Sequence, residues 1–359
     1  MKQFETIAAL LSKRVGFDAK IIGDRKIARA VKHRRVACNL PDIDAYLKTL
    51  QSSSQEFNEL VEQIVVPETW FFRDRKPFDF LVNFARSEWL LKPGTPKLRV
   101  LSVPCSTGEE PYSIAIALLE AGLPVNRFSI DAIDISERAL VKAKRAIYGK
   151  NSFRGEDWVN RDRYFQPIED KYTVCPIVRN AVHFRQGNVL NELVSTQSHY
   201  DIIFCRNLLI YLEDSACQQV LNTLHNLIST QGLLFVGASE TGKVMGDRFS
   251  YLRQSFTFVY RKIDPVSLPS LSVNLEKTSV RNTIQSSIPS APSSRRITYN
   301  SSHSSKQNLP SRAIKTSSNN HPSSPDLQQA RQLADAGHLT TAINCCKTYL
   351  ESYSTNAEA

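Results

Sequence analysis

The chain has 359 residues, a length that suggests two or three structural units. Apolar residues make up 42% of it and charged residues 22%, which fits a water-soluble globular protein. No apolar stretch approaches the roughly 20 residues that span a bilayer, and the first residues mix charge into the apolar positions. We therefore expect a cytoplasmic protein without membrane insertion.

The net charge of +10 raises the question of nucleic-acid binding. Much of the excess lies in residues 267–325, where Glu276 is the only acidic residue, and a basic tract in a linker is usually only solvated. The seven cysteines are odd in number and form no C-x-x-C pair, which favours reduced thiols. We expect no nucleic-acid partner, no disulfide framework and no metal site.

Residues 1–90 are predicted to form an N-terminal helical domain. Apolar residues at helical spacing predict helices over 4–16, 26–37, 43–51 and 57–66. The second of these helices carries a cationic cluster, which is either a docking face for a partner or a solvated surface. The cluster comprises Lys26, Arg29, Lys32, Arg34 and Arg35.

Residues 91–265 change to alternating strands and helices, which predicts an α/β domain with a mostly parallel sheet covered on both faces. β-branched and apolar runs predict strands over 97–103, 128–134, 182–189, 200–207, 232–239 and the end of 251–262. Amphipathic stretches predict helices over 110–122, 136–149 and 214–229. Ligands of such sheets bind at the carboxyl ends of the strands.

The last two segments differ in composition. Residues 266–325 are rich in serine, proline and asparagine, which predicts a disordered linker because few large apolar groups are available to bury. Residues 326–359 regain helical spacing over 34 residues, the period of a tetratricopeptide repeat. This segment predicts a tetratricopeptide-like helical hairpin, or an incidental pair of helices.

The turn between the first predicted strand and the next helix is a candidate ligand loop. It runs from Pro104 to Ser113, at the place where nucleotides lie against backbone N–H groups in such sheets. Gly108 is its only glycine, so it matches neither the dinucleotide loop nor the Walker loop. Glu109 and Glu110 would repel a phosphate, so a cationic ligand fits better; an ordinary strand-to-helix turn is the alternative.

Polar residues also follow the next three predicted strands. Asp134 ends the second strand, at the position where a ribose hydroxyl pair is usually bound. Asn188 ends the third, and Cys205 and Arg206 end the fourth. Because the carboxyl ends of parallel strands meet at one edge of a sheet, we expect these residues to share one site.

These motifs together resemble the CheR family of S-adenosylmethionine-dependent methyltransferases, which esterify glutamates of bacterial chemoreceptors. The similarity runs over about residues 1–262. It implies a Rossmann-like class I methyltransferase domain with a mostly parallel sheet, preceded by a small all-α domain. The residues that carry the resemblance are Glu68 to Asp74, Ser106 to Ser113, Asp134 and Ile135, Asn188 and Val189, Phe204 to Asn207, and Ile210 and Tyr211.

The resemblance implies roles for single residues in binding S-adenosylmethionine. Glu110 would meet the amino group of the methionine part, and Asp134 the ribose hydroxyls. Asn188 and Val189 would flank the adenine. The remaining cofactor-binding residues would be Pro67, where family members often carry asparagine, Thr69, Arg73, Cys205 and Arg206.

Arg73 and Tyr211 would be the catalytic residues, because both side chains donate hydrogen bonds that orient an acceptor carboxylate. A glutamate, with a usual pKa of about 4.3, is already ionised at neutral pH, so no strong general base is needed. The implied reaction transfers methyl groups from S-adenosylmethionine to glutamates of methyl-accepting chemotaxis proteins and leaves S-adenosylhomocysteine. The implied partner is the cytoplasmic helical bundle of a chemoreceptor, and the C-terminal repeat is expected to bind a further protein.

Two alternative functions are compatible with the same sequence features. One is a catalytically silent scaffold that binds the cofactor; retention of Arg73, Glu110, Asp134 and Tyr211 argues against it. The other is a methyltransferase for another acceptor. Enzymes that methylate DNA amino groups usually carry [DN]-P-P-Y where this chain has Cys205 to Leu208, which argues against a DNA acceptor.

A small β-subdomain insertion is expected near 164–183, and its shortness argues against binding of a receptor's tethered C-terminus.

Overall fold

The computed structural model describes residues 2–91, 96–154, 161–190, 199–244 and 248–263. It divides into two compact units, Met1–Leu275 and Glu276–Ala359. In the second unit only Gln329, Leu333, Thr341 and Ile343 to Cys345 are described, and all are helical. The predicted linker and most of the predicted hairpin therefore lie outside the described residues, and the predicted domain boundaries stay predictions.

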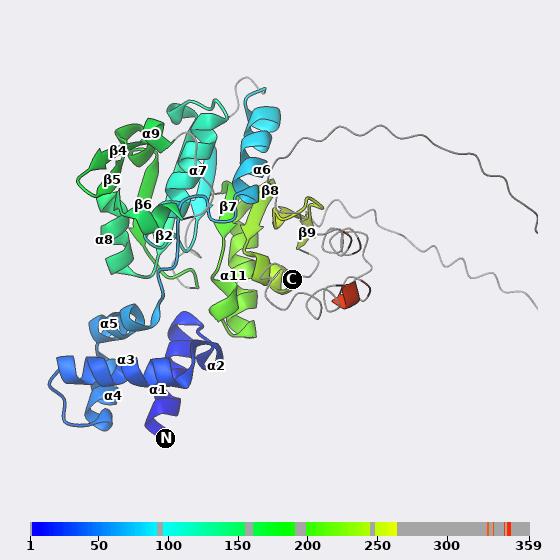
Figure 1. Cartoon of the computed structure of the whole chain (residues 1–359). Coiled ribbons are helices and arrows are strands. Elements are labelled where there is room, and N and C mark those ends of the chain that lie inside the picture. Colours follow the sequence, from blue (N-terminus) through cyan, green and yellow to red (C-terminus); the bar gives the residue numbers. More distant parts are fainter. Residues whose placement is uncertain are drawn as a thin grey trace, which may run out of the picture. The chain divides into compact units, whose positions relative to one another are not determined.

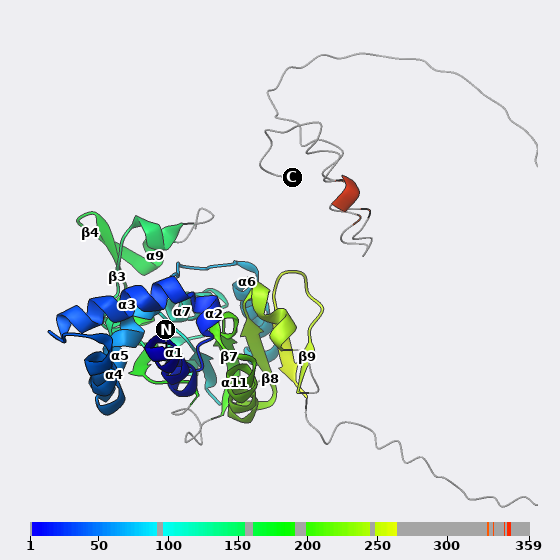
Figure 2. The ribbon, with the colours of Figure 1, turned by 90° about the horizontal axis from the view of Figure 1, so that it is seen from below.

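The first unit begins with helices, as the apolar spacing predicts. They are α1 (Lys2–Val15), α2 (Ala19–Ile22), α3 (Asp24–Ala37), α4 (Ile43–Ser52) and α5 (Ser54–Ile64). Side-chain caps fix where two of them start: Asp42 accepts from the Ala45 N–H at 2.8 Å, and Ser53 accepts from the Glu56 N–H at 3.1 Å. These helices gather on one side of the sheet (Figure 1) and lie in front of it when seen from below (Figure 2).

A buried carboxylate ties three of these helices together. Glu56 on α5 is 6% exposed. Arg34 on α3 donates to both of its oxygens, at 3.0 and 2.6 Å. Tyr46 on α4 donates at 2.9 Å, and the Cys38 thiol at 3.2 Å. Burial by itself raises the pKa of Glu56, but the hydrogen bonds from Arg34, Cys38 and Tyr46 outweigh burial, and the pKa lies below its usual value.

The centre of the unit is a seven-stranded sheet in the order β6-β2-β1-β7-β8-β10-β9. The strands from β6 to β8 run parallel, and β10 and β9 are antiparallel, so the predicted mostly parallel α/β sheet is confirmed. The strands are β1 (Leu98–Ser102), β2 (Phe128–Asp134), β6 (Val182–Gln186), β7 (Tyr200–Cys205), β8 (Ile228–Val236), β9 (Phe249–Tyr251) and β10 (Val259–Lys262). A separate three-stranded sheet has the order β3-β5-β4, with β3 (Ile147–Tyr148), β4 (Phe165–Ile168) and β5 (Lys171–Val174).

Helices alternate with the strands along the chain (Figure 1). The longer ones are α6 (Lys76–Phe84), α7 (Glu109–Glu120), α8 (Glu137–Arg145) and α11 (Asp214–Leu227), and the short ones are α9 (Arg161–Tyr164) and α10 (Pro176–Arg179). A π-helical turn (Ala85–Trp89) extends α6, and 3₁₀ turns cover Val125–Arg127, Lys150–Phe153, Leu209–Tyr211 and Ala238–Lys243. None of the helices described here is both long and apolar enough to cross a membrane.

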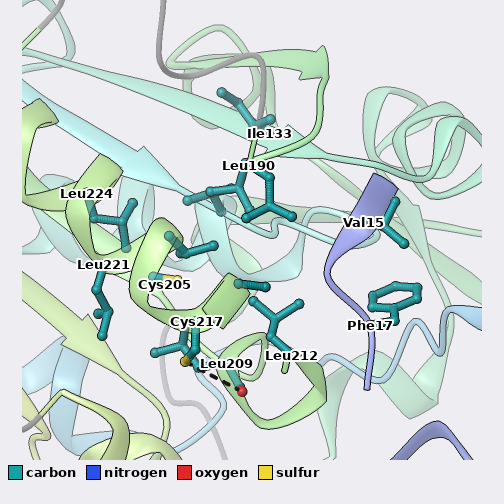
Figure 3. Close-up of a cluster of buried hydrophobic side chains, with 14 of the residues drawn as sticks. Val15, Phe17, Ile133, Leu190, Cys205, Leu209, Leu212, Cys217, Leu221 and Leu224 are labelled. Carbon is teal, nitrogen blue, oxygen red and sulfur yellow. Dashed lines mark hydrogen bonds between the residues drawn. The ribbon is translucent and has the colours of Figure 1, made fainter. Parts of the chain in front are cut away.

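The strands bury both faces, so the core has two parts. On one face, the rings of Phe204 and Phe235 stack with their centres 4.3 Å apart, and the ring of Phe78 on α6 stacks on Phe204 with a centre-to-centre distance of 5.8 Å. On the other face, α11 and the N-terminal helices pack in one continuous cluster with Ile133 and Cys205 of the sheet. Figure 3 shows part of this cluster, in which the Cys217 thiol points at the Leu209 carbonyl. The N-terminal helices thus share a hydrophobic core with the sheet.

The Glu56 network predicts a stability defect. Replacing Glu56 by Gln removes the nearer of the two carboxylates that compensate the mostly buried Arg34, the other being Glu59, and we expect a loss of about 1–3 kcal/mol in the free energy of unfolding. Because the folded-state pKa of Glu56 is lowered, its contribution is present above the unfolded value of about 4.3 and is lost as the pH falls through the folded value. Urea unfolding at pH 7 checks the loss.

The matched control is Glu5→Gln, since Glu5 is exposed on α1. Equal urea midpoints for the Glu56 and Glu5 variants would contradict the structural role of the network.

Candidate functional site

A cavity lies at the carboxyl ends of the central strands, between the sheet and the N-terminal helices. It holds about 990 Å³ of space free of protein atoms, counted out to its mouth in solvent. Its lining comprises Phe17, Ile22, Lys26, Ile64 to Trp70, Arg73, Phe78, Pro104 to Ser106, Glu110, Asp134 to Ser136, Ala139, Arg206 to Leu208 and Tyr211.

The loop after β1 turns sharply into α7, and Gly108 makes the turn possible. Its φ is +96°, and a Cβ there would lie 2.8 Å from Ala143 Cβ and 2.9 Å from the Tyr148 hydroxyl. The turn starts α7 at Glu109, so that Glu110 faces the sheet, where it is 9% exposed. The predicted ligand loop therefore delivers a buried carboxylate to the cavity.

Glu110 is one end of a buried ion network. It accepts from Ser102 Oγ at 2.8 Å and from Arg206 Nη1 at 3.1 Å. The guanidinium of Arg206, whose side chain is 1% exposed, also donates from Nη2 to Asp74 at 2.6 Å. Burial raises the pKa of the Glu110 carboxyl, and Arg206 opposes that rise. Arg206 therefore joins the β7 end to α7 and to the segment before α6.

Asp134, at the end of β2, is fixed by backbone donors. Its two oxygens accept from the Ser106 N–H at 2.7 Å and from the Ser136 N–H at 2.8 Å. The residue is 7% exposed, and burial raises its pKa to about 6 against the hydrogen bonds that lower it, with the nearby Glu62 raising it further. The carboxylate is thus held at the cavity wall and titrates close to neutral pH.

Arg73 and Tyr211, the predicted catalytic pair, line the same cavity. Arg73 Nη1 donates to the Glu68 carbonyl at 2.8 Å, and its guanidinium lies 4.6 Å from the Trp70 ring. Arg73 forms no ion pair with any residue the structure describes, because Asp74 is paired with Arg206 and Glu68 with Arg154. Both side chains are half-buried, so both are accessible from the cavity.

Four residues in the loops around the cavity adopt backbone conformations that are strained for residues other than glycine. Phe72, Asp74, Ser106 and Asn207 all have positive φ, between 48° and 60°, although none is glycine. Such conformations cost free energy and are common at functional sites.

Of the other predicted site residues, two line the cavity and three do not. Pro67 and Thr69 belong to its wall. Cys205 is fully buried in the core cluster of Figure 3, and Val189 is 7% exposed in the same cluster. The Asn188 amide donates to the Arg14 carbonyl at 2.7 Å, and its oxygen accepts from the Leu190 N–H. None of these three is part of the cavity lining, and their cofactor role stays a prediction.

Sequence reasoning missed two acidic residues that build the site. Glu240, in the 3₁₀ turn after β8, is fully buried and accepts from the N–H groups of Asn207, Leu208, Leu209 and Gly237, all at 2.6–2.8 Å. It fixes the loop between Arg206 and Tyr211. Glu62 on α5 accepts from Ser136 Oγ at 2.7 Å and from the Arg138 N–H at 3.2 Å. The local contact of Glu240 with Gly237 is the glutamate half of a capping box, a pattern visible in sequence, but its contacts with residues 207–209 and those of Glu62 join segments far apart in the chain and have no sequence signal.

Comparison with known proteins identifies the family to which the chain belongs. Residues 67–258 match the model described as "CheR methyltransferase, SAM binding domain". A "probable biofilm formation methyltransferase WspC" of Pseudomonas putida is 36% identical over 97% of this chain and 82% of its own length. The protein of the same name from Pseudomonas aeruginosa is 41% identical over 70% of this chain and 60% of its own length. A "chemotaxis protein methyltransferase" of Escherichia coli is 31% identical over 71% of this chain and 87% of its own length.

The residues of the cavity fit S-adenosylmethionine. Two buried carboxylates suit its amino group and its ribose hydroxyls, while Ile135, Ala139 and Leu208 offer an apolar wall. Ser106 Oγ and Arg206 Nε are buried without a hydrogen-bond partner among the described residues, as expected for polar atoms that line a ligand site.

Glu240 generates a prediction for the loop. In Glu240→Gln, an amide NH₂ would face two backbone N–H groups that now reach one carboxylate oxygen, so these donors would lose their acceptor. We expect a loss of about 2–4 kcal/mol in the free energy of unfolding, measured by urea denaturation.

Glu169→Gln, in the exposed turn between β4 and β5, is the control with unchanged stability. A Glu240 variant as stable as that control would show that the loop is held by other contacts.

Proposed function

Because the chain belongs to the CheR methyltransferase family, we propose that it methylates glutamate side chains of a chemoreceptor in a chemosensory pathway. The reaction would convert S-adenosylmethionine to S-adenosylhomocysteine and a glutamate to its methyl ester. The names of its relatives cover both chemotaxis and biofilm formation. The observation that carries the proposal is the meeting of Arg73 and Tyr211 with Glu110 and Asp134 in one cavity.

In this proposal the cofactor supplies a methyl group on a positively charged sulfur. Glu110 binds the amino group of the methionine part, and Asp134 binds the ribose hydroxyls. Both carboxylates are buried and held by hydrogen bonds, so little reorganisation is needed when they meet a cation or a hydroxyl pair. Pro67, Thr69 and Arg206 complete the wall around the cofactor. The roles of Asn188 and Val189 beside the adenine and of Cys205 at the methionine end stay predictions.

The acceptor carboxylate is a nucleophile that is ionised at neutral pH, so the protein has to align it rather than deprotonate it. Arg73 is suited to this task because no acidic side chain among the described residues is paired with its guanidinium. Tyr211, which lines the same cavity, donates a second hydrogen bond to the acceptor. Apolar neighbours such as Phe17 and Ile22 exclude water from the two reacting charges.

The proposed partner is the cytoplasmic helical bundle of the receptor, which places the enzyme in the cytoplasm. A hollow on α3 next to the cavity is lined by Arg25, Lys26, Arg29, Ala30, His33 and Gln63, and Lys26 belongs to both. Two members of the predicted cationic cluster point elsewhere: Arg34 is paired with Glu56, and Arg35 donates to the Leu40 and Pro41 carbonyls. The docking face is therefore the N-terminal half of α3. A protein partner for residues 326–359 stays a prediction.

Methyl transfer is the direct test. Purified protein, given S-adenosylmethionine with a labelled methyl group, is expected to label a cytoplasmic receptor fragment in a form released as methanol by mild alkali. A fragment with its candidate glutamates replaced by alanine is the control. Alkali-stable label would exclude a carboxyl ester, and absence of label on every fragment would favour a silent scaffold.

Single substitutions distinguish the proposed role of Asp134 in cofactor binding from that of Tyr211 in aligning the acceptor. Asp134→Ala is expected to abolish binding of S-adenosylhomocysteine, whereas Tyr211→Phe slows turnover and leaves that binding nearly unchanged. Because burial raises the pKa of Asp134 to about 6, affinity is expected to rise with pH from 5 to 7, by at most about tenfold per pH unit. Calorimetry of each variant across this range measures both effects.

The variant Asp134→Asn separates the contribution of Asp134 to the pH dependence of binding from that of Glu110, a second carboxyl of the cavity with a shifted pKa. A pH profile that is the same in wild type and in Asp134→Asn, or equal loss of binding in the alanine and phenylalanine variants, would refute the division of roles.

A further inference from the structure

A second hollow opens beside the cofactor cavity, between α8 and the small three-stranded sheet. It holds about 1350 Å³ of space out to solvent. We call it the α8 groove. It is lined by Val66 to Thr69, Thr107, Glu109, Lys142, Arg145, Ile147 to Gly149, Asn151, Ser152, Arg154 and Lys171.

The α8 groove shares a wall with the cavity. Residues Val66 to Thr69 line both. The Trp70 ring joins them further, because the guanidinium of Arg73 lies 4.6 Å from its centre and that of Arg154 lies 4.2 Å from it. A chain that presents a side chain to Arg73 is therefore one indole ring away from the groove.

The groove is cationic. Lys142 and Arg145 on α8 and Lys171 on β5 are exposed, and within the described part of the chain none of the three forms an ion pair. Of the two acids in the lining, Glu68 is paired with Arg154 at 3.2 Å. The other, Glu109, is 3% exposed and accepts from the hydroxyls of Thr107 and Ser152 at 2.6 and 2.9 Å. Positive charge therefore remains at the surface of the groove.

We propose that the α8 groove binds the acceptor protein next to its target glutamate, by pairing Lys142, Arg145 and Lys171 with further carboxylates of the same segment. The inference rests on the proposed function and adds to it the class of sequence that is preferred: a target glutamate flanked by acidic residues. Exposed pairs of this kind steer encounter and fix register more than they add affinity, and salt weakens them.

The lining favours a polypeptide over a nucleic acid. Channels for single strands combine positive charge with aromatic side chains on which bases stack. Tyr148 is the aromatic residue in the lining, and it is 4% exposed with its hydroxyl bound to the Thr107 carbonyl at 2.7 Å. Among the described residues of its lining, the groove thus has cations for carboxylates and no exposed ring for a base.

The test replaces the three cations together, as Lys142→Gln, Arg145→Gln and Lys171→Gln in the full chain. The control is Lys144→Gln, which removes an exposed cation of the same helix outside the groove. Binding of a fluorescent glutamate-rich helical peptide is followed by anisotropy, at low salt and at 0.5 M NaCl. Methylation of the receptor fragment and binding of S-adenosylhomocysteine are measured beside it.

The triple variant is expected to bind the peptide about tenfold more weakly at low salt, to raise KM for the receptor fragment by a similar factor, and to keep kcat and cofactor affinity. The control is expected to match wild type. Equal peptide binding in wild type and triple variant would refute the proposed role of the groove in binding the acceptor. Tighter binding of an oligonucleotide of equal charge that displaces the peptide would refute it as well. Peptide binding that depends on the cations, without methylation of any fragment, would instead refute the proposed function and leave the groove standing.

Discussion

The site depends on one buried guanidinium. Arg206 leaves β7 inside the protein, where an uncompensated charge would be very costly, and it is stable there because Glu110 and Asp74 accept from its two terminal nitrogens. Those two acids come from α7 and from the segment before α6, so the requirement to compensate one charge brings three distant segments to one point. Glu240 completes the constraint from the other side by binding the backbone directly after Arg206.

A second set of contacts connects the N-terminal helices to the end of the cavity that holds Asp134. Arg34 on α3 and Arg138 on α8 both pair with Glu59 of α5, at 3.3 and 2.6 Å. One turn further along α5, Glu62 accepts from Ser136, whose own N–H donates to Asp134. The helix that carries the proposed docking face is therefore joined, through α5, to the carboxylate proposed to bind the cofactor.

Much of this arrangement follows from the sequence, and the remainder shows what a sequence omits. Strand periodicity and the polar residues at strand ends indicate the parallel sheet and the convergence of Glu110, Asp134 and Arg206, because parallel strands place their carboxyl ends together. Whether a residue at a strand end faces the cavity or the core depends on a single step of the two-residue strand period, and so Cys205 lies in the core while Arg206 lines the cavity. The contacts of Glu240 with residues 207–209 and of Glu62 with Ser136 and Arg138 reach across the fold through backbone N–H groups and a hydroxyl, and no sequence pattern encodes them.

The two arginines of the cavity differ in their surroundings, and that difference separates their tasks. Arg206 is enclosed by two carboxylates and has little positive charge left to offer a substrate. Arg73 is held by a backbone carbonyl and by the face of Trp70, contacts that fix its position without neutralising it. A group that orients a carboxylate nucleophile needs this second kind of support, because a full ion pair within the protein would compete with the acceptor. The pairing of Asp74 with Arg206 and of Glu68 with Arg154 therefore leaves Arg73 available for the proposed role.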